Sequence, residues 1–112
     1  MRITVNIKPK IRRVLGQLKA ELKSTYGTRL VHVILFGSQA RGDAKPRSDI
    51  DVVVVLEGVV EPGKEIARTG KIISMLSLRY DAVVSCIFVS ADRYSKEQTP
   101  LLLNVRSEGV IV

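Results

Sequence analysis

The stretch "ILFGSQARGDAKPRSDIDVVVVL", from Ile34 to Leu56, decides the fold. It contains two apolar runs, which we predict to be β-strands, joined by a glycine–serine step and a charged connection of ten residues. The second run, over residues 51–56, is apolar on both faces of a strand, which predicts a central strand covered on both sides. Asp49 and Asp51 stand at its start. Carboxylates are costly beside a buried strand unless they bind something, so this stretch also indicates the functional site.

Outward from this stretch, the spacing of apolar residues predicts the other elements. On the predicted helix over residues 64–79, the residues expected to face inward are Ile66, Ile73 and Leu76. In chain order the predicted elements are a helix over 8–26, strands over 30–36 and 51–56, a helix over 64–79, a strand over 82–89, a short helix capped by Ser90, a helical turn over 100–109, and a final strand or tail over 110–112.

This order predicts a small α/β domain, with one mixed β-sheet flanked by helices. The second strand, the long helix and the third strand form a βαβ unit, so these two strands should be parallel. The first two strands are joined by a short connection, which favours antiparallel neighbours. The 112 residues are enough for one core, and we expect residues 1–112 to form a single domain.

Composition narrows the classes of partner. Eighteen Lys and Arg against eleven Asp and Glu give a net charge of +7, which indicates an anionic partner or simply a basic, soluble surface. Aromatic residues are only 4%, which argues against a binder of single-stranded nucleic acid. Cys86 is the only cysteine, so an intrachain disulfide is excluded and a zinc cluster is disfavoured. No run reaches the roughly 18 apolar residues of a membrane span, and we expect a cytoplasmic protein without membrane contact.

The predicted antiparallel pair brings the glycine–serine step beside the two aspartates. Asp49 and Asp51 are two residues apart in a strand, so both point to the same face. Two such carboxylates repel each other unless a cation neutralises them, and their oxygens favour Mg²⁺ or Mn²⁺. Asp81 is predicted to open the third strand. If that strand runs parallel beside the second, Asp81 lies near the pair and completes a site for two divalent ions.

The glycine–serine step is suited to phosphate. Gly37 lets the backbone approach a ligand closely, and Ser38 adds a hydroxyl where a helix can start. Arg41 and Arg47 lie in the connection and can reach phosphate oxygens. A phosphate-binding turn beside a metal-binding pair predicts phosphoryl or nucleotidyl transfer. The alternative is that these residues have no catalytic function, since Ser-Asp before a strand can be a simple turn and Asp-x-Asp alone is common.

The segment "GSQARGDAKPRSDIDVVV" resembles the signature of the polymerase β-like nucleotidyltransferase superfamily, and is most similar to its minimal nucleotidyltransferase domains. The resemblance implies the polymerase β palm-like fold. It also implies that Gly37 and Ser38 hold the phosphates of the nucleotide and that Asp49 and Asp51 are metal ligands. Asp81 is the candidate for the third carboxylate of the family, although its neighbours depart from the usual apolar pattern. For the arginine of "GSxARG" two roles stay open: positioning the triphosphate or structuring the turn.

The resemblance further implies a metal-dependent enzyme that moves AMP, or another nucleotide, from ATP or another NTP to an acceptor. Minimal domains of this kind pair with a small helical HEPN-type protein, so the implied acceptor is a hydroxyl of such a partner and the implied role is that of an antitoxin. Two alternatives stay open: a binding module that neutralises its partner by contact, and transfer to a small molecule or RNA. The apolar tail "GVIV" fits either a homodimer contact or a simple C-terminal strand.

Overall fold

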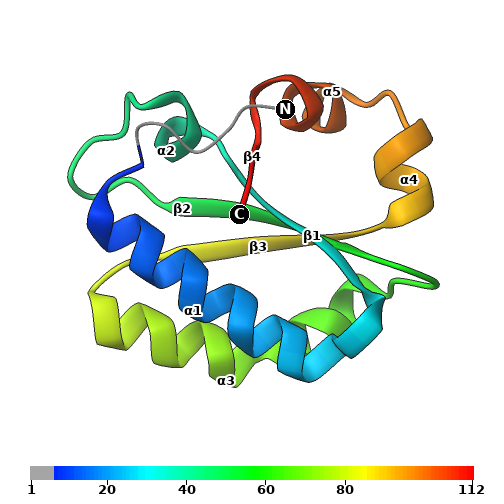
Figure 1. Ribbon diagram of the computed structural model, residues 1–112, viewed down its shortest axis with the longest axis horizontal. Helices are drawn as coiled ribbons and strands as arrows, with labels where there is room; N and C mark the ends of the chain where they lie inside the picture. The colour runs from blue at the N-terminus through cyan, green and yellow to red at the C-terminus, as the bar shows by residue number, and fades with distance from the viewer. Residues whose placement is uncertain (1–6) are drawn as a thin grey trace.

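The structure, a computed structural model, describes residues 7–112 as a four-stranded sheet with helices on both faces (Figure 1). The predicted mixed α/β architecture is therefore confirmed. The elements in chain order are α1 (Pro9–Tyr26), a 3₁₀ turn (Gly27–Arg29), β1 (Leu30–Phe36), α2 (Ser38–Arg41), β2 (Ile50–Leu56), α3 (Pro62–Tyr80), β3 (Val84–Ser90), α4 (Ala91–Lys96), α5 (Pro100–Glu108) and β4 (Val110–Ile111).

The strand order is β3-β2-β1-β4. β2 runs antiparallel to β1 and parallel to β3, as the short connection and the βαβ unit predict. β4 pairs with the free edge of β1, so the apolar tail forms a C-terminal strand. The sequence did not show which strand this tail would join, because a strand of two residues has no pattern that selects a neighbour.

β2 is buried on both faces, which confirms it as the central strand. Val52 and Val54 pack into the larger cluster of apolar residues, under α1 and α3. Val53 and Val55 pack into the smaller cluster, against α5. In the described part of the chain, no helix is long and apolar enough to cross a membrane. The predicted first helix is confirmed as α1, and its apolar residues at helical spacing are buried: Ile11, Val14, Leu15, Leu18 and Leu22.

The predicted inward face of α3 is partly wrong. Leu76 is fully buried, but Ile66 is 59% exposed. The helix turns Glu65 and Thr69 toward the sheet instead, at 3% and 1% exposure. The Glu65 carboxylate can lie there because it accepts hydrogen bonds from the chain, including one of 2.9 Å from the Tyr26 hydroxyl. A polar side chain with such partners is tolerated inside, and a count of apolar positions cannot anticipate it.

The expectation that Asp81 opens the third strand is also wrong. β3 begins at Val84, and Asp81 is the C-terminal cap of α3, in the left-handed conformation at φ 48°. The amide of Ala82 donates to the Ser77 carbonyl at 3.1 Å, which closes the last turn of the helix. The chain therefore needs residues 81–83 to leave α3 before it can enter the sheet.

Candidate active site

Gly37 and Asp51 are in direct contact at the mouth of β2. The antiparallel pairing of β1 and β2 sets Phe36 opposite Asp51, so Gly37 follows at the end of β1. Gly37 has φ 73° and ψ −155°, a conformation that side chains rarely adopt. A Cβ placed on Gly37 would lie 2.8 Å from Oδ2 of Asp51. The predicted adjacency is confirmed, and glycine is required there both for its backbone angles and for the space that the carboxylate occupies.

The short helix α2 begins at Ser38, directly after this contact. The Gly37 carbonyl accepts hydrogen bonds from the amides of Ala40 and Arg41, each at 3.1 Å. The amides of Ser38 and Gln39 precede these bonds, so they have no acceptor within the helix. Two backbone donors and the Ser38 hydroxyl thus stand at the same turn as the Asp51 carboxylate, which is the combination that a phosphate next to a cation requires.

Asp49 and Asp51 form a carboxylate pair anchored by the residue between them. Ile50 is fully buried, and its amide donates to the Val83 carbonyl at 2.8 Å. Asp51 is half-buried and Asp49 is exposed. Burial and the neighbouring charge of Asp49 raise the pKa of Asp51 above its ordinary value. The protein thus holds two like charges together without neutralising them, an arrangement that favours a bound cation.

The pair suits a divalent ion such as Mg²⁺, which proteins usually bind through one or two carboxylates together with substrate phosphates. Among residues 7–112 there is no group of three or more His, Cys, Asp or Glu side chains that could hold a metal ion. The donor set of the protein therefore consists of two aspartates, and the remaining ligands would come from phosphate, water or neutral oxygens. Asp49, Asp51 and Asp81 do not form a triad.

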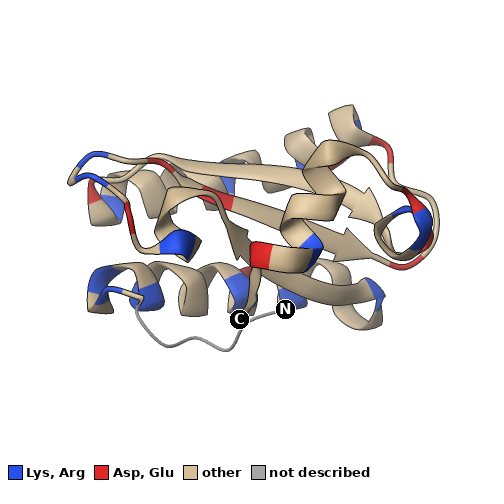
Figure 2. Ribbon diagram, turned by 90° about the horizontal axis from the view of Figure 1, so that it is seen from above, with Lys and Arg blue, Asp and Glu red and all other residues tan. Residues whose placement is uncertain are grey.

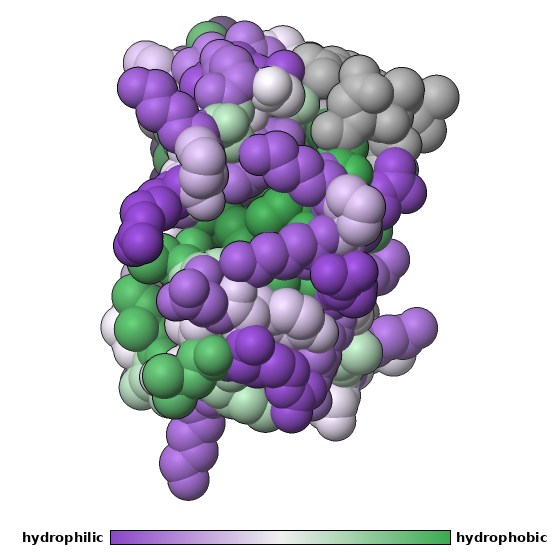
Figure 3. Space-filling model, turned by 90° about the vertical axis from the view of Figure 1, so that its left-hand side faces the viewer, coloured by the Kyte–Doolittle hydropathy of each residue, from purple (hydrophilic) through white to green (hydrophobic). Residues whose placement is uncertain are grey.

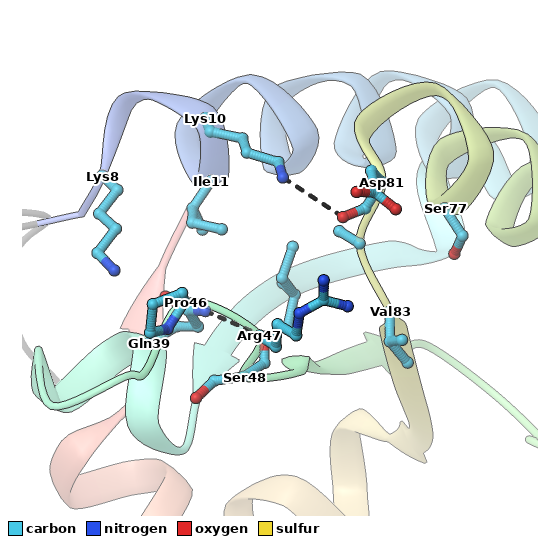
Figure 4. A pocket seen from close by; sticks show the side chains of 12 residues that line it. Lys8, Lys10, Ile11, Gln39, Pro46, Arg47, Ser48, Ser77, Asp81 and Val83 are labelled. Atoms are coloured by element: carbon cyan, nitrogen blue, oxygen red, sulfur yellow. Dashed lines mark hydrogen bonds between the residues drawn. The ribbon is translucent and has the colours of Figure 1, made fainter.

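Arg47 and Asp81 line a different space, a pocket of about 420 Å³ (Figure 4). Its wall includes Ile50, whose side chain points away from the face that carries Asp51, so the pocket lies on the other side of β2. The Lys10 ammonium donates to the backbone carbonyl of Asp81 at 3.4 Å. Figure 3 views this end of the molecule and shows apolar atoms between hydrophilic side chains. The structure therefore does not bring Asp81 together with the aspartate pair, and contact of Arg47 with phosphate stays a prediction.

Arg41 is held by neighbouring carboxylates. Its Nε lies 3.2 Å from Asp43 and its Nη1 lies 3.8 Å from Glu108, so the side chain joins α2 to the connection and to the end of α5. These contacts give the arginine of the motif a role in structuring the turn. Its side chain is still 44% exposed and close to the glycine–serine step, and contact with phosphate stays a prediction.

Gln39 is a positioning residue that sequence reasoning did not identify. It is buried, at 8% exposure, and its side-chain amide donates to the Ser48 carbonyl at 3.3 Å. The Ser48 hydroxyl accepts from the Lys45 amide at 2.8 Å. These bonds hold the end of the connection in place directly before Asp49. The preference of glutamine for solvent gives no sequence signal for this role, since only the fold buries it.

The connection is basic as well as ordered. Lys45 and Arg47 lie in it, and Lys8 and Lys10 lie at the start of α1, across the pocket from Arg47. Figure 2 shows Lys and Arg on both segments at this end of the molecule. These side chains add positive charge at this end of the molecule, where it favours the approach of an anionic ligand.

Comparisons with known proteins agree with this geometry. The family model described as "Nucleotidyltransferase domain" matches residues 15–104. A Methanocaldococcus jannaschii protein named "Putative protein adenylyltransferase MJ0141" is 36% identical over 100 residues, or 88% of this chain and 95% of that protein. The "Protein adenylyltransferase MntA" of Thermococcus cleftensis is 36% identical over 74 residues, or 66% of this chain and 73% of that protein.

Solved structures show the same fold. The chain aligns with a crystal structure titled as a toxin–antitoxin with AMP-PNP at a TM-score of 0.63 and 20% sequence identity, covering 86% of this chain and 69% of that one. A likeness at this identity concerns the fold, whereas the family model spans most of the sequence, from the middle of α1 into α5. The chain accordingly belongs to the nucleotidyltransferase domain family and is a nucleotidyltransferase.

Proposed function

We propose that this nucleotidyltransferase moves AMP from ATP to a hydroxyl of a partner protein, in a reaction that depends on a divalent cation. The observation that carries the proposal is the contact between Gly37 and the Asp51 carboxylate, beside the free amides at the start of α2. A phosphate bound at those amides would lie next to any cation held by Asp49 and Asp51. Bound there, Mg²⁺ or Mn²⁺ supplies positive charge that stabilises the phosphates and lowers the pKa of the attacking hydroxyl.

Each residue of the site then has a task. The backbone amides of Ser38 and Gln39 and the Ser38 hydroxyl bind phosphate oxygens, and Gly37 leaves room for the Asp51 carboxylate. The acceptor oxygen forms a bond to the α-phosphorus while the bond to pyrophosphate breaks. Pyrophosphate leaves with the electron pair, and the hydroxyl proton passes to a base or to water. Arg41 lies close enough to the turn to assist phosphate binding.

The named relatives support the choice of nucleotide and acceptor class. Two of the similar proteins carry the name protein adenylyltransferase, and a protein of the same fold was crystallised as a toxin–antitoxin with AMP-PNP, an ATP analogue. By analogy we propose ATP as the donor and a protein as the acceptor. The resemblance of the motif extends this to a small helical HEPN-type partner, which the chain would silence as an antitoxin.

The small number of carboxylates at the site favours a second function, in which the protein neutralises a partner by contact alone. The described chain places no third carboxylate with Asp49 and Asp51. A site with two carboxylates holds cations less tightly than one with three, and a weak catalyst of this kind can still bind nucleotide and partner. Transfer to a small molecule or to RNA has no specific observation in its favour.

The test is a titration of the purified chain with ATP, with and without Mg²⁺, followed by intact mass spectrometry of a co-expressed helical partner. Metal-dependent ATP binding and a partner heavier by one or more AMP groups are the expected results. Addition of EDTA should remove both. ATP binding without any gain in mass would favour the contact-only function, and the absence of nucleotide binding would contradict the proposal.

A further inference from the structure

Ser85 is the side chain that lies beside Asp51 on the neighbouring strand. The parallel register of β2 and β3 pairs Asp51 with Ser85, Val53 with Ile87 and Val55 with Val89. Paired residues of adjacent strands lie about 4.8 Å apart and point to the same face of the sheet. Val53, Val55 and Val89 all belong to the smaller apolar cluster, so Asp51 and Ser85 share the face that this cluster covers further along the strands.

On the adjoining strands, the other neighbours of the aspartate pair have no side-chain oxygen to offer. On the β1 side, Phe36 is opposite Asp51. Directly before β3, the Val83 carbonyl accepts the hydrogen bond from the Ile50 amide, and Val83 is 58% exposed. Ser85 is exposed, and within residues 7–112 its hydroxyl has no hydrogen-bond partner. A third protein oxygen at this site therefore has one source on β3, the Ser85 hydroxyl.

We propose that Ser85 supplies the third protein oxygen of the metal–nucleotide site, where the sequence analysis expected the carboxylate of Asp81. This inference rests on the proposed function, since it assumes a cation between Asp49 and Asp51. A hydroxyl is a neutral ligand, so the protein contributes only two negative charges. The site binds a free cation weakly and gains its cation together with the negatively charged triphosphate.

The charge of the residue at position 85 should then determine how tightly the protein binds the cation in the absence of nucleotide. In Ser85→Asp, a third carboxylate joins the pair, and we expect the affinity for Mn²⁺ without nucleotide to rise by about tenfold or more, since ligand charge tunes such sites. Ser85→Ala should weaken Mn²⁺ binding a few-fold. Ile87→Asp is the matched control, because Ile87 is exposed on the same face but two residues further from Asp51, beyond ligand distance.

The measurement is the binding of Mn²⁺ alone, followed by electron paramagnetic resonance, for the full chain and the three variants, each with its fold checked by circular dichroism. A gain in affinity confined to Ser85→Asp supports the proposal. Equal Mn²⁺ affinities for Ser85→Asp and Ile87→Asp, or no change in any variant, would overturn it. If the unaltered chain binds no Mn²⁺·ATP while Ser85→Asp gains a Mn²⁺ site, the proposed function fails but the placement of Ser85 stands.

A nearly isosteric variant, Ser85→Cys, serves if the aspartate does not fold. A thiolate beside two carboxylates prefers Zn²⁺ over Mn²⁺, so the ratio of Zn²⁺ to Mn²⁺ affinity should rise at least about tenfold. The native thiol of Cys86 does not interfere, because burial raises its pKa to about 12 and strand alternation points it to the opposite face. An unchanged ratio in the folded variant would also overturn the proposal.

Discussion

Glu65 is a buried carboxylate and Asp51 a half-buried one, and their surroundings shift their pKa values in opposite directions. Burial raises the pKa of Glu65, but hydrogen bonds from the Glu61 backbone and Tyr26, with the charges of Arg68 and Arg29, outweigh it and lower that pKa. For Asp51, burial and the charge of Asp49 both raise the pKa. Glu65 is thus stabilised as an anion by the chain itself, whereas Asp51 is left with another anion as its neighbour.

The difference separates a structural carboxylate from a functional one. Glu65 binds the Tyr26 hydroxyl at 2.9 Å and Arg68 at 2.7 Å, so it joins the end of α1 to the start of α3. The Asp51 carboxylate lies against the Gly37 backbone, and no cationic side chain contributes to the shift of its pKa. Active sites commonly keep such unfavourable charges because a ligand neutralises them.

The largest effect is expected for activity. Asp51→Asn and Asp49→Asn each remove a charge that holds the cation, and we expect transfer to fall by about a thousandfold or more, since metal stabilisation is worth several kcal/mol. AMP incorporation into the partner is the measurement. Asp92→Asn is the control, because Asp92 is an exposed aspartate on α4 that pairs with Lys96. Normal transfer by both site variants would contradict the proposal that Asp49 and Asp51 hold the cation for AMP transfer.

For the structural carboxylate, the expected loss is in stability. Glu65→Ala leaves the buried Tyr26 hydroxyl without its acceptor and removes the partner of Arg68, which should cost about 3 kcal/mol in the free energy of unfolding. Urea denaturation measures it. The exposed Glu57 provides the control, and Glu57→Ala should change stability by less than about 0.5 kcal/mol. Equal losses in the two variants would remove the contrast with Asp51.

A third prediction concerns the glycine that touches Asp51. Gly37→Ala should cost about 2 to 3 kcal/mol, because its backbone conformation is nearly restricted to glycine and the new Cβ would clash with the carboxylate. Gly42→Ala should cost only about 1 kcal/mol, since Gly42 has φ 84° in the common left-handed region and open space around it. Thermal unfolding of both variants measures the difference. If the two losses are the same, the contact at Gly37 carries no energy.

The smallest effect is the pH dependence of stability without metal. The folded-state pKa of Asp51 is raised, so its protonated form favours folding at acid pH and that contribution is lost as pH rises through the folded pKa. Asp51→Asn should therefore melt a few degrees higher than the unaltered chain at neutral pH, and the gap should close in acid. Melting curves with EDTA test this. A variant that melts lower at neutral pH would mean that the Asp51 carboxylate stabilises the empty fold.

The pairing of β1 with β2, and with it the contact of Gly37 with Asp51, could be predicted from the sequence. A short connection of ten residues favours antiparallel neighbours, and the run "IDVVVVL", apolar on both faces, requires a central strand with partners on both sides. The inward turn of Glu65 could not be predicted, because its partners come from α1 and from the first turn of its own helix, and only packing brings them together.

The sequence by itself determined the order of the elements, the central position of β2 and the place of the aspartate pair, because strand and helix periods act over a few neighbouring residues. Tertiary structure decided what lies beside the pair. The left-handed cap at Asp81 delays the start of β3, and the packing of α3 sets the register that puts Ser85 next to Asp51. Register between parallel strands depends on the whole crossover, whose length and packing no local pattern records.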